Sequence, residues 1–253
     1  MSLKSALGVP VSWHFLLKQV PEEQGVPSLV LGQEFLDAFP VHQFVYTQGH
    51  WREKLVDVDT TDDSVHHFRL VLSPSSTPAA KTLMRRFEGA GIVPTEGAGV
   101  EISPMALSTC EEISNRLCRS GGAALLVDYG ENFPQPDSLR GFKNHKLVDF
   151  LSTPGDTDLT ADVDFDSCAR VAAQRGAVVV GAIPQGEFLV RMGIVNRVEQ
   201  LIDLPTTSDE KAVDLLQSLR QLVDYKDMGT RFKVLAIHDP KKEANTIGFP
   251  PFP

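Results

Sequence analysis

The sequence has no apolar run long enough to cross a membrane. The run Ala123 to Val127, for example, is ended by Asp128, whereas a spanning helix needs about 18 apolar residues. The sequence also lacks an excess of positive charge, because 24 Lys and Arg stand against 33 Asp and Glu, for a net charge of −9. These absences predict no membrane span and no surface that coats nucleic acid, and they leave a cationic partner open.

Cysteine is scarce, and the usual signals of metal and redox sites are missing. The three cysteines, Cys110, Cys118 and Cys168, show no CxxC spacing and have no histidine near them. We interpret them as small buried residues in a reducing compartment, and we predict no metal site. The first 17 residues include Lys4 but no arginine, so we expect no targeting peptide in the chain as given.

Several catalytic motifs are also absent. The sequence contains neither GxSxG nor HExxH, which argues against an α/β-hydrolase and a zinc protease. Two Gly-Ala-Gly triplets, at 89–91 and 97–99, lack the strand-before, helix-after context of a phosphate-binding loop. Neither triplet is therefore predicted to bind a dinucleotide.

What is present is an ordinary globular composition, with 42% apolar and 23% charged residues over 253 positions. The segments 28–31 and 123–127 are short and wholly apolar, which is typical of buried strands in a parallel sheet. Ser103 and Pro104 begin a predicted helix that runs to about Arg119, and two glycines separate it from the second strand. A helix that feeds such a strand indicates an α/β fold.

The rest of the chain completes this prediction. Residues 41–47 and 51–58 are expected to form an antiparallel hairpin, to which 65–72 adds a third strand. Later segments alternate between helix and strand, and the expected ranges are helices at 13–20, near 81–87, from 164 or 166 to 175, 186–192 and 210–223, and strands at 100–102, 177–183 and 232–237. We predict a folded unit at 1–238, an antiparallel insertion at about 41–72 and a disordered tail at 239–253.

Ligands of open α/β sheets bind beyond the carboxyl ends of the parallel strands, which directs attention to residues 33–40 and 128–130. Glu34 and Asp37 are three residues apart, so they either clamp a cationic group together or cap a helix end. Asp128 and Tyr129 either form the floor of a pocket or make a capping turn. The acidic run at 158–166 is expected to be a solvated face with a helix N-cap.

The segment Leu31-Gly-Gln-Glu-Phe-Leu-Asp-Ala-Phe-Pro-Val-His-Gln-Phe44 resembles the NE-F-(F/L)-DALPV-x-x-F segment of the MidA-like methyltransferases. Further motifs follow in the order and spacing of that family, namely Trp51-Arg-Glu, Val100-Glu-Ile-Ser-Pro, Gly121 to Gly130, Leu139-Arg-Gly-Phe142, Asp158 to Phe165 and Gly181 to Leu189. The resemblance covers about residues 8–237, corresponds to the later half of the family chain, and is nearest to the mitochondrial member.

This resemblance implies a fold and an activity. The fold is the α/β, Rossmann-like sheet of class I S-adenosylmethionine-dependent methyltransferases, here without its N-terminal strands and with an antiparallel hairpin insertion. The implied activity is protein arginine N-methylation with S-adenosyl-L-methionine, specifically symmetric dimethylation of a subunit of respiratory complex I during its assembly. The implied location is the mitochondrial matrix, and a homodimer remains open.

For this activity, position at the strand ends and side-chain chemistry assign residues to roles, and His42 is included only for its nearness in sequence to the acids. Glu34, Asp37 and His42 are the expected catalytic residues, with the two acids pairing a guanidinium and His42 accepting the late proton. Gln33 and Glu34 are expected to contact the cofactor, although the family usually has Asn where Gln33 stands. Asp128 and Tyr129 are expected to bind the substrate.

Two other functions are compatible with the sequence. The family's glycine-rich cofactor loop and its ribose-binding acid belong upstream of Met1, so the chain is either a truncated isoform or an incomplete gene model. A non-catalytic assembly or scaffold protein would keep the hairpin at 41–58 as a docking surface. A carboxylate-based hydrolase using Glu34 and Asp128 is disfavoured because nothing indicates a sugar-binding groove.

Overall fold

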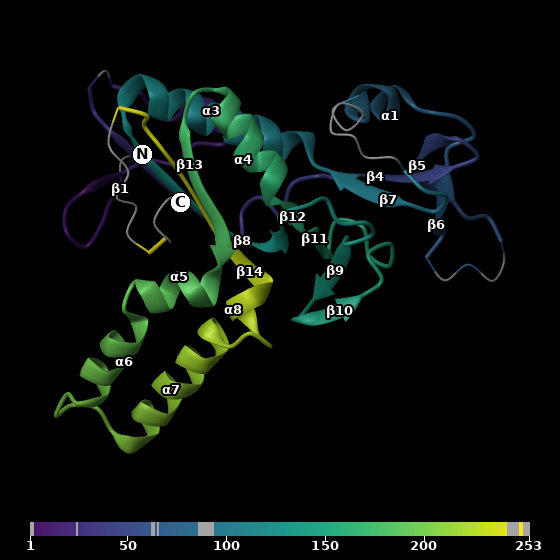
Figure 1. Cartoon of the computed structure of the whole chain (residues 1–253). Coiled ribbons are helices and arrows are strands. Elements are labelled where there is room, and N and C mark those ends of the chain that lie inside the picture. The colour runs from purple at the N-terminus through teal and green to yellow at the C-terminus, as the bar shows by residue number, and fades with distance from the viewer. Residues whose placement is uncertain are drawn as a thin grey trace.

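A computed structural model describes residues 3–23, 25–61, 64, 66–85, 94–241 and 248–249. Within these ranges the chain forms a central α/β sheet, a separate antiparallel sheet and a helical arm (Figure 1). Among the described residues, no helix is both long enough and apolar enough to span a bilayer.

The central sheet is built around one long strand, β8 (Gly122–Glu131). The strand β3 (Ser28–Gln33) pairs with β8 in parallel, and the short β12 (Val163–Asp164) pairs in parallel with its far end. On the other side of β8 lie β14 (Phe232–His238), which runs antiparallel, and then β13 (Val178–Pro184). The carboxyl ends of β3 and β8 therefore meet at one edge of the sheet, as the α/β prediction requires.

Two helices cover one face of this sheet side by side: α3 (Pro104–Ser120) and α4 (Phe165–Gln174) (Figure 1). Ser103 caps α3 through a hydrogen bond from the backbone N–H of Ala106, as the sequence predicts. Asp164 caps α4 in the same way, accepting from the backbone N–H of Ser167 at 3.1 Å. Their buried side chains join those of β8 and β14 in the main hydrophobic core.

The predicted antiparallel insertion is a four-stranded sheet. It contains β4 (His42–Thr47), β5 (His50–Val58), β6 (Phe68–Leu72) and β7 (Gly99–Ile102), in the order β6-β5-β4-β7, with the short helix α1 (Pro78–Leu83) beside it. A turn at Gln48 and Gly49, both with positive φ, joins β4 to β5, as the hairpin signal predicts. The predicted helix near 81–87 begins three residues earlier, and residues 86–93 lie outside the described ranges.

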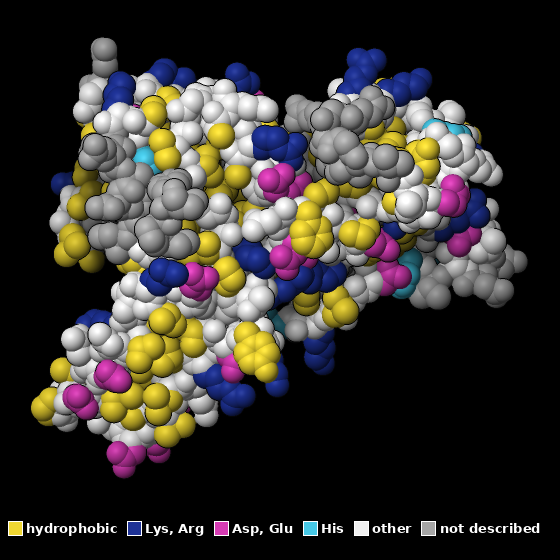
Figure 2. Space-filling model, viewed as in Figure 1, with side chains coloured by type: hydrophobic (Ala, Val, Ile, Leu, Met, Phe, Trp, Pro, Cys, Tyr) yellow, Lys and Arg dark blue, Asp and Glu magenta, His cyan; other side chains and the backbone are white. Residues whose placement is uncertain are grey.

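A small three-stranded sheet and a helical arm complete the fold. The small sheet consists of β9 (Arg140–Lys143), β10 (Lys146–Val148) and β11 (Asp158–Thr160), with β9 in the middle. The arm consists of α5 (Gln185–Arg191), α6 (Ile194–Ile202), α7 (Asp209–Val223) and α8 (Met228–Arg231), and it extends away from the sheet (Figure 1). Figure 2 shows apolar side chains gathered on this arm, where Val195, Val213 and Leu216 are exposed.

The structure differs from the sequence-based predictions at several elements, and strands β9, β10 and β11 and helix α8 are among those not predicted. The expected helix at 13–20 is a single 3-10 turn, η1 (Leu17–Gln19), which follows the two-residue strands β1 (Leu3–Lys4) and β2 (Pro10–Val11). Helix α6 was not predicted. Strand β3 is not buried on both faces, because Leu29 is 87% and Leu31 72% exposed at the edge of the sheet.

The predicted tail at 239–253 lies partly outside the described residues. Within it, Asp239 is buried, and Phe249 is buried and packs against Phe188 with ring centroids 5.3 Å apart. Residues 242–247 and 250–253 lie outside the described ranges.

Candidate functional site

The turn that follows β3 is held in place by Asp128, at the end of β8. The Oδ2 atom of this carboxylate accepts hydrogen bonds from three successive backbone N–H groups, those of Phe35 at 3.0 Å, Leu36 at 2.9 Å and Asp37 at 3.3 Å. Asp128 is only 1% exposed, so the carboxylate supports this turn from beneath. The contact ties together the carboxyl ends of two parallel strands.

Glu34, immediately before this turn, has a left-handed backbone with φ +45°. A residue with a β-carbon adopts this conformation at a cost, and it persists only where the surroundings impose it. Here the Glu34 backbone N–H donates to the carbonyl of Val127 at 3.0 Å, while Asp128 holds the next three N–H groups. The strained backbone directs the Glu34 side chain into a cleft at the sheet edge.

Asp37 lies at the floor of the same cleft and is 8% exposed. Its Oδ2 atom accepts hydrogen bonds from the hydroxyl of Tyr129 and from that of Thr160, the latter at 2.6 Å. Its Oδ1 atom is buried and has no hydrogen-bond partner among the described residues. Because a buried carboxylate oxygen is normally paired, Asp37 retains acceptor capacity beneath the cleft floor, which a small movement of the side chain would have to expose.

The ring of Tyr129 forms the next part of the cleft wall. The guanidinium groups of Arg140 and Arg231 lie 5.2 Å and 5.8 Å from the ring centroid, within cation–π range. Both guanidiniums donate through Nη2 to a single atom, Oδ1 of Asp162, at 2.7 Å each. Asp162 is therefore a buried partner of two arginines, whereas the sequence predicts that the whole 158–166 run is solvated.

These groups surround one cleft of about 620 Å³. The acids Glu34, Asp37 and Asp158 line it together with Tyr129, Arg140 and Arg231. Asn144 and His145, which form the turn between β9 and β10 and both have positive φ, line the same space. The cleft thus presents carboxylates near β3 and guanidinium groups beside the ring of Tyr129.

The structure brings three of the predicted site residues together and places three others elsewhere. Glu34, Asp37 and Tyr129 line the cleft. Asp128 lies below it, and Gln33 is exposed at the end of β3, next to Glu34. His42 does not line the cleft: its Nδ1 lies 2.6 Å from Oε1 of the buried Glu53, and its ring stacks on Phe44.

Burial changes the ionisation of the two residues at the end of β8. Burial, reinforced by the negative charge of Asp37, raises the pKa of Asp128 to about 7, although the N–H groups of Phe35 and Leu36 oppose the rise. Burial and the hydrogen bond to the Asp37 carboxylate also raise the pKa of Tyr129. Tyr129 therefore stays protonated and donates to Asp37 at neutral pH.

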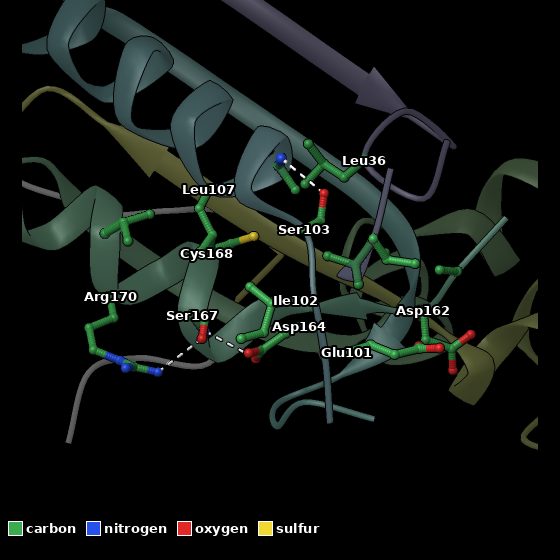
Figure 3. A pocket seen from close by; sticks show the side chains of 15 residues that line it. Leu36, Glu101, Ile102, Ser103, Leu107, Asp162, Asp164, Ser167, Cys168 and Arg170 are labelled. Atoms are coloured by element: carbon green, nitrogen blue, oxygen red, sulfur yellow. Dashed lines mark hydrogen bonds between the residues drawn. The ribbon is translucent and has the colours of Figure 1, made fainter. Parts of the chain in front are cut away.

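A smaller cavity, of about 60 Å³, lies where α3 and α4 begin (Figure 3). Leu36, Ile102 and Leu107 contribute apolar walls, and the Cys168 sulfur points toward them. The caps of both helices close its ends, with Ser103 and Asp164 hydrogen-bonded to backbone N–H groups. We interpret this cavity as a packing gap behind the turn after β3.

Sequence reasoning missed Arg140, Arg231, Asp162 and Thr160 as part of the site. The motif Leu139-Arg-Gly-Phe142 was noticed only as part of a resemblance, and Arg231 stood in no motif. The sequence held a signal for Asp162, because the run at 158–166 contains more acids than a single N-cap requires. Nothing in the sequence indicates that two arginines converge on Asp162.

Comparison with known proteins decides the family. A family model described as "Putative S-adenosyl-L-methionine-dependent methyltransferase" matches residues 2–183, which is more than half of the chain. The chain belongs to this methyltransferase family. The resemblance noted from the motifs and the predicted fold class are thereby confirmed.

Relatives within this methyltransferase family are named in several animals. The chain is 40% identical over 230 residues to the mouse protein "Protein arginine methyltransferase NDUFAF7, mitochondrial", and the match covers 91% of this chain and 49% of the mouse protein. A Drosophila melanogaster homologue of the same name is 40% identical, with 92% of this chain and 51% of that protein covered. The chain therefore spans about half the length of the curated relatives that it matches.

A solved structure shares the methyltransferase fold. A Burkholderia thailandensis protein, solved with bound S-adenosyl-homocysteine, superposes with a TM-score of 0.73 at 23% identity. The match covers 90% of this chain and 57% of the other. At this identity the likeness establishes the α/β fold alone.

Proposed function

We propose that this chain carries the substrate side of a protein arginine methyltransferase that uses S-adenosyl-L-methionine. The observation that supports the proposal best is the pair Glu34 and Asp37 at the carboxyl end of β3, with Oδ1 of Asp37 buried and unpaired among the described residues. A guanidinium is always protonated and carries five donors, so two adjacent carboxylates suit it. The names of the animal relatives support the same class of substrate.

The two acids fix the arginine and its charge. S-adenosyl-L-methionine, when bound, supplies an electrophilic methyl group for in-line displacement. Methyl transfer of this kind depends mainly on alignment, so the task of Glu34 and Asp37 is to hold two guanidinium nitrogens and leave the third accessible. Tyr129 keeps Asp37 in place by donating to its Oδ2 atom.

Gln33 and Glu34 are the cofactor contacts that we propose for this chain. Both are exposed at the carboxyl end of β3, where open α/β sheets bind their ligands, and an amide and a carboxylate there suit the hydroxyl and amine groups of a nucleoside. We do not propose His42 as a catalytic residue or Asp128 as a substrate-binding residue. Glu53 holds His42 outside the cleft, and Asp128 acts by positioning the turn.

By similarity to relatives named as mitochondrial we also propose a mitochondrial location. From the motif resemblance alone we propose the matrix as the compartment and a subunit of respiratory complex I as the protein that is symmetrically dimethylated. A second candidate, a non-catalytic scaffold, is favoured by the exposed Leu29 and Leu31 on β3, because an open apolar edge suits binding of another chain. Calorimetric titration with S-adenosyl-L-methionine separates the two candidates. Only the methyltransferase must bind this cofactor and so give a measurable heat of binding.

The decisive test of the arginine site is Glu34→Gln, with Glu199→Gln on the exposed face of α6 as its control. Both variants remove one negative charge, but only the first lies in the cleft. We expect Glu34→Gln to abolish methyl transfer from labelled cofactor and to weaken binding of an arginine peptide. Equal activity and equal peptide affinity in both variants would contradict the proposal.

A further inference from the structure

The guanidinium pair on the far side of Tyr129 has more hydrogen-bonding capacity than its contacts use. Arg140 and Arg231 each carry five N–H donors, and in the described part of the chain each uses one, toward Oδ1 of Asp162. The Nε atom of Arg140 is buried and has no partner among those residues. The pair is therefore only partly satisfied by the protein.

The charges in this corner also leave room for a further acceptor. Asp162 is the one carboxylate that both guanidiniums contact among the described residues, although Glu34, Asp37 and Asp158 line the same cleft. The Arg231 side chain is 42% exposed and that of Arg140 31%, so both guanidiniums are accessible from the cleft. Because both Nη2 atoms lie 2.7 Å from one oxygen, they are at most 5.4 Å apart. The remaining N–H donors of two guanidiniums this close can converge on one further carboxylate through charge-assisted hydrogen bonds.

We infer that Arg140 and Arg231 form a subsite for a glutamate or aspartate side chain located next to the target arginine in the protein substrate. This inference rests on the proposed function, since it takes the Glu34 and Asp37 side of the cleft as the place of that arginine. It adds the chemical class of the neighbouring residue and two residues that determine specificity.

The geometry sets how near the acidic residue lies to the arginine. Tyr129 spans the two halves of the cleft, with its hydroxyl bonded to Asp37 and its ring beside both guanidiniums. The two charged ends are separated by about one tyrosine side chain, which an extended peptide covers in one to three residues at ~3.3–3.6 Å each. The preferred substrate therefore has Asp or Glu within three residues of the arginine.

Binding of short peptides to the 253-residue chain tests this inference by calorimetry. The peptides are acetylated and amidated and carry Arg with Glu, Arg with Gln, or Gln with Glu, two positions apart. We expect the Arg–Glu peptide to bind about tenfold more tightly than the Arg–Gln peptide, since a charge-assisted hydrogen bond at a partly exposed site supplies this order of preference. Arg231→Gln should abolish the preference, and Arg231→Lys should restore only part of it.

The matched control is Arg191→Gln on α5. Its side chain is also 42% exposed and also pairs with one carboxylate, that of Glu187, but it lies outside the cleft. This variant should retain the tenfold preference. Thermal unfolding of all variants shows whether any loss comes from misfolding, and the Arg231→Lys variant keeps the charge that Asp162 requires.

The outcomes separate the two proposals. Equal binding of the Arg–Glu and Arg–Gln peptides, with both weakened by Glu34→Gln, would overturn the subsite and leave the proposed function standing. Binding of the Gln–Glu peptide that is lost in Arg231→Gln, with no effect of arginine, would support the subsite and contradict the arginine site. A fourth peptide, Arg–Gln with a free carboxyl terminus, would overturn the assignment to a side chain if it bound more tightly than the others. Failure of every peptide to bind at millimolar concentration would overturn it as well.

Discussion

The Oδ2 atom of Asp128 lies 2.9 Å from the backbone nitrogen of Leu36, a residue 92 positions earlier in the chain. This contact joins the end of the central strand to the turn that carries Glu34 and Asp37. The acids of the cleft therefore depend on a carboxylate that the substrate does not reach. The contact also gives the site a pH dependence that can be measured.

Asp128→Asn tests that dependence. The folded protein raises the pKa of Asp128 to about 7, whereas an unfolded chain has the ordinary value of ~3.9. The folded state thus binds more protons between these values, so the stabilising contribution is complete below about pH 4 and is lost as the pH rises toward 7. In thermal scans from pH 4.5 to 7.5, the wild-type melting temperature should fall relative to that of Asp128→Asn. The fall should be about 2–4 °C for each kcal/mol of unfolding free energy that is lost as Asp128 ionises. Parallel pH curves for the two proteins would contradict this.

Tyr129→Phe tests the role of the phenol in holding Asp37. The substitution keeps the ring beside Arg140 and removes the hydroxyl that donates to Oδ2 of Asp37. Because Oδ1 already has no partner among the described residues, the loss leaves a buried carboxylate still less satisfied. We expect the free energy of unfolding to fall by about 1–3 kcal/mol in urea titrations. Tyr225→Phe, at a 71% exposed tyrosine, should change it little.

Gly122→Ala tests the close approach of β3 to β8. Gly122 has φ +115°, and an added β-carbon would lie 1.9 Å from the carbonyl oxygen of Ser28. Gly155 is the control, since its φ of +82° carries a similar conformational penalty and no atom lies within 4 Å of the added carbon. We expect Gly155→Ala to cost about 1 kcal/mol and Gly122→Ala to cost severalfold more or to prevent folding, as measured by circular dichroism and denaturant titration. Similar losses of stability in the two variants would contradict this, because they would show that β3 moves away from the added β-carbon without a cost in free energy.

Leu31→Lys tests the open edge of the sheet. Leu29 and Leu31 are exposed on β3, whose described pairing is with β8 alone. Such an edge recruits other chains, and a lysine on it discourages that pairing. We expect the wild-type chain to sediment as aggregates or higher oligomers and Leu31→Lys to shift it toward the monomer. A wild-type chain that sediments as a soluble monomer at tens of micromolar would overturn this expectation.

Local sequence signals predicted most of the fold. The Ser103-Pro104 helix start, the twin glycines before β8 and the Gln48-Gly49 turn each reflect backbone chemistry that acts within a few residues, and each is found where it was expected. Helix α6 was not predicted, although its apolar residues recur at the spacing of an amphipathic helix, so this signal was available in the sequence. The apolar composition of β3 predicts burial on both faces, whereas the resemblance to the later half of the family chain predicts an exposed edge at Leu29, Val30 and Leu31, and Leu29 and Leu31 are indeed exposed.

The candidate site was predictable only in the part that is local. Glu34 and Asp37 stand three residues apart at a strand end, and this spacing and position identify them as candidate site residues. Arg140 and Arg231 reach Asp162 from 22 and 69 positions away, and that convergence depends on the small sheet and on α8. His42 shows the opposite error, because nearness in sequence to the acids did not place it in their cleft.

The position of β8 also determines when during synthesis the sheet can form. Ala123 pairs with Leu29 on one side, 94 residues earlier, and with His238 on the other, 115 residues later. The ribosome therefore releases β3 and β8 while the strand that covers the second side of β8 has yet to be made. Sheets that rely on such distant pairs fold slowly, over milliseconds to seconds for small domains, and their apolar strands stay exposed in the interval. The nascent chain consequently leaves one side of β8 unpaired until β14 has emerged.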